Sequence, residues 1–214
     1  MNDMKKVIVF DMDGVLFDTT AVAEQYMTER FPNMPLEIRK ELLSGNFHDQ
    51  VKKYADTLPP SVETPEEREI RQSGFAARKL ESAMYDGMHD LVTALHRGGY
   101  TITMNTTALS RNCLPMLEKA GLSAAFDFVA TFETARSKVD KFNLIAERYG
   151  VENKDMIFIT DTLGDIREAE IAGVPTIAVT WGAHDISYFT REQHANLVKI
   201  VNTPEELESW IRQY

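Results

Sequence analysis

Residues 6–19 read KVIVFDMDGVLFDT, and we expect the architecture of the chain to form around this stretch. Its first part, Lys6–Phe10, is a compact run of β-branched and aromatic residues, which is typical of a buried strand. Asp11 and Asp13 follow directly, and Gly14 has the conformational freedom that a tight turn requires. The stretch therefore predicts a buried strand whose carboxyl end can turn two carboxylates toward one pocket; an Asp-rich turn that merely ends the strand is the alternative.

After residue 19 the strand signal disappears, and residues 20–84 contain only amphipathic helical pieces separated by prolines and glycines. From Gly87 onward, short apolar runs alternate with amphipathic segments again. That alternation predicts a parallel sheet covered by helices on both faces and joined by right-handed crossovers. The expected later strands are Tyr100–Asn105, Phe126–Thr131, Met156–Thr160, Thr176–Thr180 and an edge strand at Leu197–Val201.

The composition excludes several classes of protein. Of the 214 residues, 43% are hydrophobic and 26% are charged, as in an average globular domain with a sizeable core. The formal net charge of −10 argues against a nucleic-acid partner, and no apolar run approaches the roughly 18 residues that span a bilayer. The single cysteine, Cys113, fits a reducing compartment. We expect a cytoplasmic monomer or weak homodimer without nucleic-acid or membrane partners.

Ligands of such sheets bind beyond the carboxyl ends of the strands, so the residues there are candidates for a site. Thr106 and Thr107 follow the second strand, and their hydroxyls can donate to phosphate oxygens. Lys138 stands at a predicted helix start, where the helix dipole disfavours a cation. It is either an anion ligand or a solvated surface lysine, and Arg136 and Lys141 are neighbouring alternatives.

The fourth strand is followed by Asp161 and Asp165, whose hard carboxylate oxygens suit Mg²⁺. Asp165 has a second interpretation, because an aspartate ahead of a helix over residues 166–172 is an ordinary N-terminal cap. With Asp11 and Asp13, these acids would repel a phosphate, whereas a divalent cation and a lysine would reverse the local potential. Together the residues predict a Mg²⁺-dependent phosphoryl-transfer site.

In this order, the motifs resemble those of the haloacid dehalogenase-like superfamily, in its helical-cap branch of phosphoglycolate phosphatase-like enzymes. The stretch Asp11–Thr19 is similar to the first motif of that family nearly word for word. The resemblance covers essentially the whole chain. It implies an α/β fold with a Rossmann-like, doubly wound parallel sheet over residues 1–19 and 85–214, and an all-α helical cap inserted over residues 20–84.

The resemblance also implies roles for individual residues. Asp11 would be the nucleophile that forms an aspartyl-phosphate, and Asp13 would act first as general acid and then as general base. Thr106 and Lys138 would match the second and third motifs and bind phosphoryl oxygens, although Lys138 lacks the proline that commonly follows it in this branch. The spacing of Lys138 from the glycine after its helix favours it over Lys141.

The fourth motif of the family corresponds to Asp161 and Asp165, with Thr160 in place of a glycine. The implied ligands of the metal are Asp11, Asp161 and the backbone carbonyl of Asp13, with Asp165 supporting them. The expected cofactor is therefore Mg²⁺.

The expected substrate is a small phosphorylated metabolite. In the family a glycine-containing cap loop selects the substrate, and Gly45-Asn46-Phe47-His48 lies at that place; an ordinary turn is the alternative. Asp13 favours a phosphatase or phosphomutase over a dehalogenase, and His48 stands where mutases often carry arginine. The alternatives left open are a phosphomutase or pyrophosphate hydrolase on the same site, and a non-catalytic phospho-acceptor or binding module.

Overall fold

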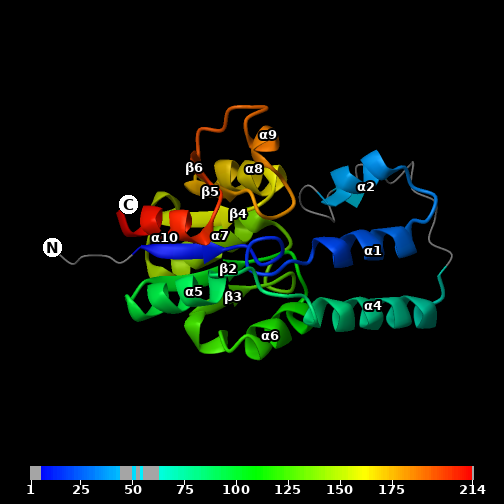
Figure 1. The fold of residues 1–214 in the computed structure, drawn as a ribbon. Helices are drawn as coiled ribbons and strands as arrows, with labels where there is room; N and C mark the ends of the chain where they lie inside the picture. The colour runs from blue at the N-terminus through cyan, green and yellow to red at the C-terminus, as the bar shows by residue number, and fades with distance from the viewer. Residues whose placement is uncertain (1–5, 44–49, 52–53, 55–62, 214) are drawn as a thin grey trace.

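A parallel β-sheet forms the centre of the computed structural model, which describes residues 6–43, 50–51, 54 and 63–213. The strands are β1 (Val7–Phe10), β2 (Thr101–Asn105), β3 (Phe128–Ala130), β4 (Met156–Thr160), β5 (Thr176–Val179) and β6 (Leu197–Val201). Figure 1 shows them in the order β3-β2-β1-β4-β5-β6. All neighbouring strands pair in parallel, as predicted.

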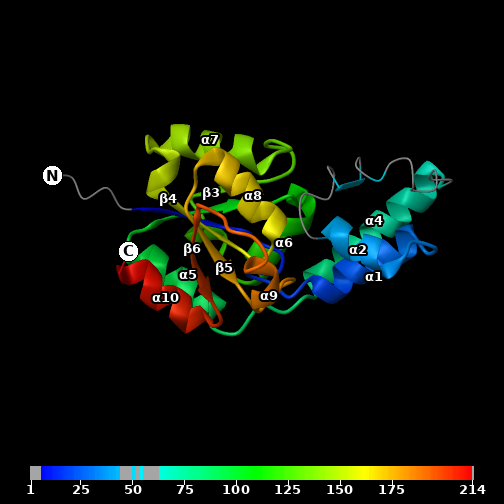
Figure 2. The same ribbon diagram turned by 90° about the horizontal axis from the view of Figure 1, so that it is seen from above.

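Helices cover both faces of this sheet, as Figure 2 shows. They are α5 (Met88–Arg97), α6 (Ser110–Lys119), α7 (Lys138–Tyr149), α8 (Leu163–Ala172) and α10 (Pro204–Gln213), with the short α9 (Ile186–Phe189) after β5. Successive residues of β1 face opposite sides: Ile8 and Phe10 belong to the apolar cluster with α5, α6 and α10, and Val7 and Val9 to the cluster with α7 and α8. The predicted doubly wound α/β architecture is confirmed.

A second group of helices extends beyond the carboxyl edge of the sheet, formed by α1 (Thr20–Arg30), α2 (Leu36–Leu43) and α4 (Pro65–Leu80). Between α1 and α4, the ring centroids of Tyr26 and Phe75 lie 4.6 Å apart. Helix α4 begins with a capping box, in which the Thr64 hydroxyl accepts from the amide of Glu67 at 3.2 Å. The helical insertion between β1 and β2 is therefore confirmed.

Two linker segments, residues 11–19 and 81–87, connect this insertion to the sheet, and they pair with each other. The amide of Asp18 donates to the carbonyl of Ala83 at 2.9 Å, and the amide of Tyr85 donates to the carbonyl of Leu16 at 3.0 Å. The chain thus enters and leaves the insertion at one place, beside the carboxyl end of β1.

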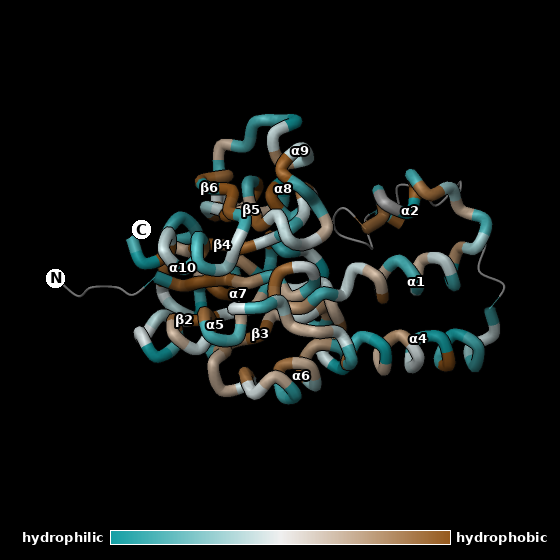
Figure 3. Tube along the Cα trace, viewed as in Figure 1, coloured by the Kyte–Doolittle hydropathy of each residue, from teal (hydrophilic) through white to brown (hydrophobic). Residues whose placement is uncertain are grey.

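Apolar residues concentrate in the sheet, whereas α4 is largely hydrophilic, as Figure 3 shows. Strand β3 is shorter than the predicted Phe126–Thr131, because the amide of Thr131 donates to the hydroxyl of Thr134 at 3.1 Å and leaves the ladder. Within the described ranges, no helix has the length and apolar character needed to cross a membrane.

Candidate active site

The carboxyl edge of the sheet brings together the acids that the sequence singled out. Asp11 follows β1 and Asp161 follows β4, and these neighbouring strands align Phe10 with Ile159. The amide of Asp11 donates to the carbonyl of Ile159 at 2.9 Å, which fixes the point where the chain leaves the sheet. The strand order reverses between β1 and β4, the position at which doubly wound sheets bind ligands.

Two glycines allow the backbone to close around Asp161. Gly14 has a φ of +74°, and a Cβ there would lie 1.8 Å from Oδ2 of Asp161. At Gly182, in the loop after β5, a Cβ would lie 2.4 Å from the same oxygen. Any larger residue at either position would displace the carboxylate. The turn predicted after β1 therefore requires glycine at position 14, both because φ is positive there and because Asp161 approaches so closely.

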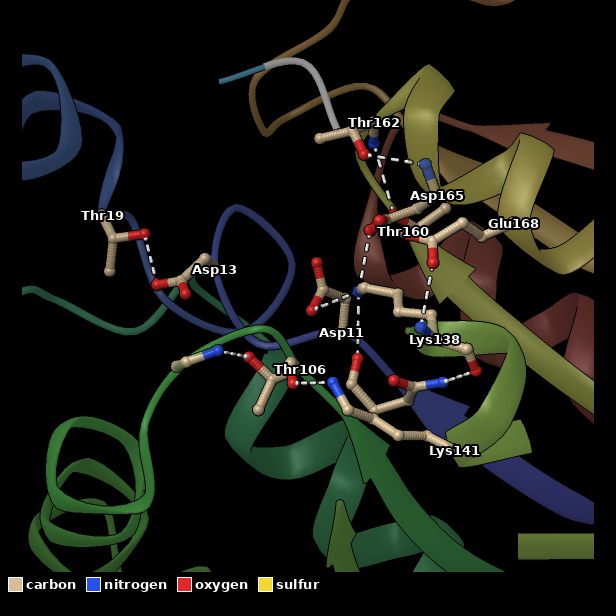
Figure 4. Close-up of polar contacts among 12 residues, drawn as sticks. Asp11, Asp13, Thr19, Thr106, Lys138, Lys141, Thr160, Thr162, Asp165 and Glu168 are labelled. Atoms are coloured by element: carbon tan, nitrogen blue, oxygen red, sulfur yellow. Dashed lines mark hydrogen bonds and ion pairs between the residues drawn. The ribbon is translucent and has the colours of Figure 1, made fainter. Parts of the chain in front are cut away.

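Lys138 joins Asp11, which follows β1, to Asp165 of α8, as Figure 4 shows. Its Nζ lies 2.9 Å from Oδ1 of Asp11 and 2.8 Å from Oδ2 of Asp165, and it donates to the carbonyl of Asn105 at 3.0 Å. Although burial favours the neutral amine, the charges of Asp11 and Asp165 raise the pKa of Lys138. Lys138 is therefore the buried ammonium beside Asp11, whereas Arg136 lies over the ring of Phe132.

The start of α7 tolerates this lysine because other groups satisfy the helix end. The hydroxyl of Ser137 accepts from the amide of Val139 at 3.0 Å, which caps the helix. The amide of Lys138 itself donates to Oε1 of Glu168 at 2.9 Å, so a carboxylate also stands at the positive end of the helix dipole. Burial, and then the charge of Asp165, raise the pKa of Glu168.

Asp165 is not the cap of α8, and that interpretation of the sequence was wrong. Thr162 is the cap, and its hydroxyl accepts from the amide of Asp165 at 3.3 Å. The carboxylate of Asp165 instead accepts from the hydroxyl of Thr160 at 2.8 Å, in addition to its pair with Lys138. The threonine that replaces the family's glycine thus orients Asp165 toward the site.

Asp161 has one satisfied carboxylate oxygen and one that is free to bind a ligand. Its Oδ2 accepts from the amide of Ala183 at 2.7 Å, whereas Oδ1 is buried and has no hydrogen-bond partner among the described residues. Burial raises the pKa of Asp161 to about 7. The hydrogen bond from the Ala183 amide opposes this rise, and the charge of Asp165 adds to it. Burial also raises the pKa of Asp11 against the charge of Lys138. A divalent cation would relieve this excess of negative charge.

The chemistry of the predicted donor set fits Mg²⁺. In the part of the chain that the structure describes, no group of three or more His, Cys, Asp or Glu side chains is arranged to hold a metal ion. The predicted set has only two carboxylates, from Asp11 and Asp161, and a backbone carbonyl. Mg²⁺ is commonly bound by one or two carboxylates and keeps several waters.

Asp13 faces the linker segments and the insertion rather than the sheet. The hydroxyl of Thr19 donates to its Oδ1 at 2.8 Å, and Lys79 of α4 lies 2.7 Å from its Oδ2. The side chain of Lys79 is 3% exposed and that of Asp13 36%. This carboxylate is therefore positioned by the insertion and still open to a ligand.

The predicted phosphate-binding threonines lie at the same edge. Thr106 is buried and Thr107 partly exposed, directly after β2. The Thr106 hydroxyl oxygen accepts from the amide of Ala108 at 3.1 Å, which leaves its own hydrogen able to donate. Its carbonyl accepts from Nζ of Lys141 at 2.6 Å. Lys141, weighed as an alternative to Lys138, thus contacts the threonine backbone.

Sequence reasoning missed three contributions to this site. Lys79 occupies an amphipathic helix with no local signal of burial, and the role of Glu168 depends on the packing of α8 against α7. His184 is buried, and its Nδ1 accepts from the amide of Leu163 at the start of α8 at 3.1 Å, a contact between distant segments. The predicted substrate loop Gly45–His48 lies outside the described residues.

Comparisons with known proteins agree with this arrangement. The family model for haloacid dehalogenase-like hydrolases matches residues 8–179. A phosphoglycolate phosphatase from Agrobacterium fabrum is 32% identical over 195 residues, which cover 86% of this chain and 84% of that protein. An N-acetylmuramic acid 6-phosphate phosphatase from Pseudomonas aeruginosa is 28% identical over 215 residues, covering 94% and 92%.

Solved structures share the fold. CbbY from Rhodobacter sphaeroides, determined in complex with phosphate, has a TM-score of 0.75 and 22% sequence identity. The match covers 95% of this chain and 96% of that one. At this identity the likeness establishes the architecture of sheet and helical insertion.

Proposed function

This chain belongs to the haloacid dehalogenase-like hydrolase family as one of its phosphatases, and we propose that Asp11 is its nucleophile. The observation that supports the proposal most is the 2.9 Å contact between Oδ1 of Asp11 and Nζ of Lys138. This pair stands at the reversal point of the sheet, where a carboxylate and a buried positive charge can meet the same phosphoryl group.

In the proposed reaction, an oxygen of Asp11 attacks phosphorus and the bond to the leaving alkoxide breaks. Asp13 gives its proton to that alkoxide, and later takes a proton from the water that hydrolyses the aspartyl-phosphate and restores Asp11. Lys138 and the hydroxyl of Thr106 bind phosphoryl oxygens, and Thr107 is a further donor beside them. The charge of Lys138 stabilises the negative charge that the transferring group carries.

Mg²⁺ is the proposed cofactor, since phosphatases of this family generally use it. Asp11, Asp161 and the backbone carbonyl of Asp13 would hold the ion, and Asp165 would support the site through Lys138. When bound, the ion supplies positive charge that polarises the phosphoryl group and offsets the surrounding acids. The buried Oδ1 of Asp161, which has no partner in the part of the chain that the structure describes, is the observation that favours this site.

We further propose that residues 1–19 and 85–214 form the catalytic core and residues 20–84 a substrate-selecting cap. The paired linker segments and the contact of Lys79 with Asp13 support this division. The loop Gly45-Asn46-Phe47-His48 remains the predicted substrate contact. The proposed setting is a cytoplasmic monomer or weak homodimer.

The proposed substrate is a small phosphorylated metabolite. One relative is named a phosphoglycolate phosphatase and another an N-acetylmuramic acid 6-phosphate phosphatase, which favours monoesters of small hydroxy acids and of sugars. Such substrates share a dianionic phosphoryl group and differ in the leaving group. The core would bind the first, and the cap would select the second.

Release of phosphate from an aryl phosphate and from a panel of phosphorylated metabolites tests the proposal. We expect hydrolysis of monoesters with Mg²⁺, loss of it with EDTA, and recovery when Mg²⁺ is added back. Asp90→Asn, at an exposed aspartate of α5, is the control for Asp→Asn substitutions in the site and should keep full activity. Absence of phosphate release from every monoester would contradict the proposal.

The same panel separates the alternatives. Pyrophosphate and a sugar phosphate are included, because a pyrophosphate hydrolase or a phosphomutase would use the same acids. Preferred hydrolysis of pyrophosphate, or conversion of one sugar phosphate into its isomer without phosphate release, would favour one of these. A phospho-acceptor module would take up a phosphoryl group without turnover.

A further inference from the structure

The site contains a second buried lysine that the proposed mechanism does not use. Lys141 lies one helical turn after Lys138 on α7, and its exposed fraction is 0%. Its ammonium donates to the carbonyl of Thr106 at 2.6 Å, while Lys138 donates to the carbonyl of Asn105 at 3.0 Å. Figure 4 shows Lys141 and Lys138 converging on the segment that leaves β2, so two ammonium groups hold two successive carbonyls.

A lysine at this position is unfavourable for the fold itself. Burial lowers the pKa of Lys141 to about 8, and the like charge of Lys138 adds to this lowering. An apolar residue of similar shape would avoid the desolvation of the ammonium, and such replacements of buried charges are often neutral or stabilising. Stability alone therefore does not account for Lys141, whereas its contact with Thr106 gives it a task in the site.

We propose that Lys141 is a positioning residue for phosphoryl binding, because it fixes the Thr106 carbonyl and so orients the Thr106–Thr107 segment. This inference rests on the proposed function, in which Thr106 binds a phosphoryl oxygen. The amide of Thr106 donates to the carbonyl of Ala130 at 3.0 Å, and its hydroxyl accepts from Ala108. These contacts hold the segment on the β3 side, and Lys141 holds it on the α7 side.

The test measures the affinity for inorganic phosphate by titration calorimetry in the presence of Mg²⁺, together with the melting temperature at pH 7. Lys141→Met keeps the aliphatic stem and removes the donor. We expect it to weaken phosphate binding by about 10- to 100-fold, the range for lost partners of site residues. Its melting temperature should equal or exceed that of the wild type. Lys141→Gln keeps a donor and should recover part of the affinity.

Ile145→Val is the matched control, because it removes one methylene from a buried residue one turn further along α7. It should lower the melting temperature and leave phosphate affinity unchanged. The proposal is overturned if Lys141→Met binds phosphate like the wild type. It is also overturned if both variants lower the melting temperature to a similar degree and Ile145→Val loses as much phosphate affinity as Lys141→Met. The loss of affinity would then follow from a loss of stability.

Failure of the proposed function gives a different result, namely a wild-type protein that binds phosphate but releases none from monoesters. In that case the binding titration still decides the role of Lys141. A wild-type protein that binds no phosphate at all would overturn the inference as well.

Discussion

Asp11 and Asp13 are close neighbours in the sequence, yet they belong to two different regions of the molecule. Asp11 lies at the sheet edge, where the core residue Lys138 holds its carboxylate. Asp13 faces the insertion, where Thr19 and Lys79 hold its two oxygens. The side chain of Asp11 is 10% exposed and that of Asp13 is 36% exposed.

This difference separates a fixed half of the site from a half that depends on the cap. The groups around Asp11 come from α7 and α8, which pack on the sheet, so we expect their geometry to be the same for different ligands. The contacts of Asp13 join the core to α4, so its position is linked to that of the insertion. Changes in the first half should affect all substrates alike, and changes in the second half should depend on the leaving group.

The largest effect is expected for Asp11→Asn. A neutral amide does not attack phosphorus, and loss of about 10⁶-fold in kcat follows the deletion of a protease nucleophile. Because the change is nearly isosteric, the melting temperature should stay close to that of the wild type. Rates of phosphate release measure the effect, and a variant with a substantial fraction of wild-type activity would exclude Asp11 as nucleophile.

Asp13→Ala should reduce turnover of alkyl phosphates by about 10²–10⁴-fold, the usual contribution of a general acid. Aryl phosphates have good leaving groups that need less protonation, so their first step should suffer far less. The measurement is a plot of rate against the pKa of the leaving group for both proteins. Equal losses for all substrates would show that Asp13 acts only structurally and would break the contrast between the two halves.

Much of this organisation could be predicted from the sequence, because it depends on local patterns. The apolar run of β1 and the glycine turn after it identify the sheet and its edge. Asp165 was ambiguous, because an aspartate ahead of a helix serves either as a cap or as a site residue, and only the packing of α8 beside Lys138 selects between these roles.

Contacts between distant segments could not be predicted in the same way. Lys79 meets Asp13 across 66 positions of sequence, and its amphipathic helix carries no local signal that this lysine is buried. Lys138 and Lys141 both face the site, so the choice between them was less exclusive than the sequence suggested. In both cases a long, charged side chain is buried by tertiary packing, which hydrophobic periodicity does not report.

The two metal-site aspartates should differ in a smaller but measurable way. Asp161→Asn should weaken the apparent affinity for Mg²⁺ by about 10- to 100-fold, and more than Asp165→Asn does, because Asp161, unlike Asp165, has a buried oxygen with no partner among the described residues. Activity titrated against Mg²⁺ concentration gives both values. The reverse ranking would transfer the ligand role to Asp165.

The smallest effect is expected for Lys79→Met, which releases one oxygen of Asp13 and keeps the apolar stem of the lysine. We expect a loss of about 10-fold in kcat for alkyl phosphates, at the low end of general-acid effects, and little change for aryl phosphates. Lys154→Met, at an exposed lysine that contacts Glu152, is the control and should change neither. An equal loss for both substrate classes would place Lys79 in the fixed half.

Trapping of the covalent intermediate tests the nucleophile most directly. An aryl phosphate is mixed with Asp13→Ala and Mg²⁺ and quenched in acid, since this variant forms the aspartyl-phosphate but lacks the base that hydrolyses it. Mass spectrometry of the peptide over residues 7–30 should then find one phosphoryl group on Asp11. Release of phosphate while Asp11 stays unmodified at every quench time would contradict the account.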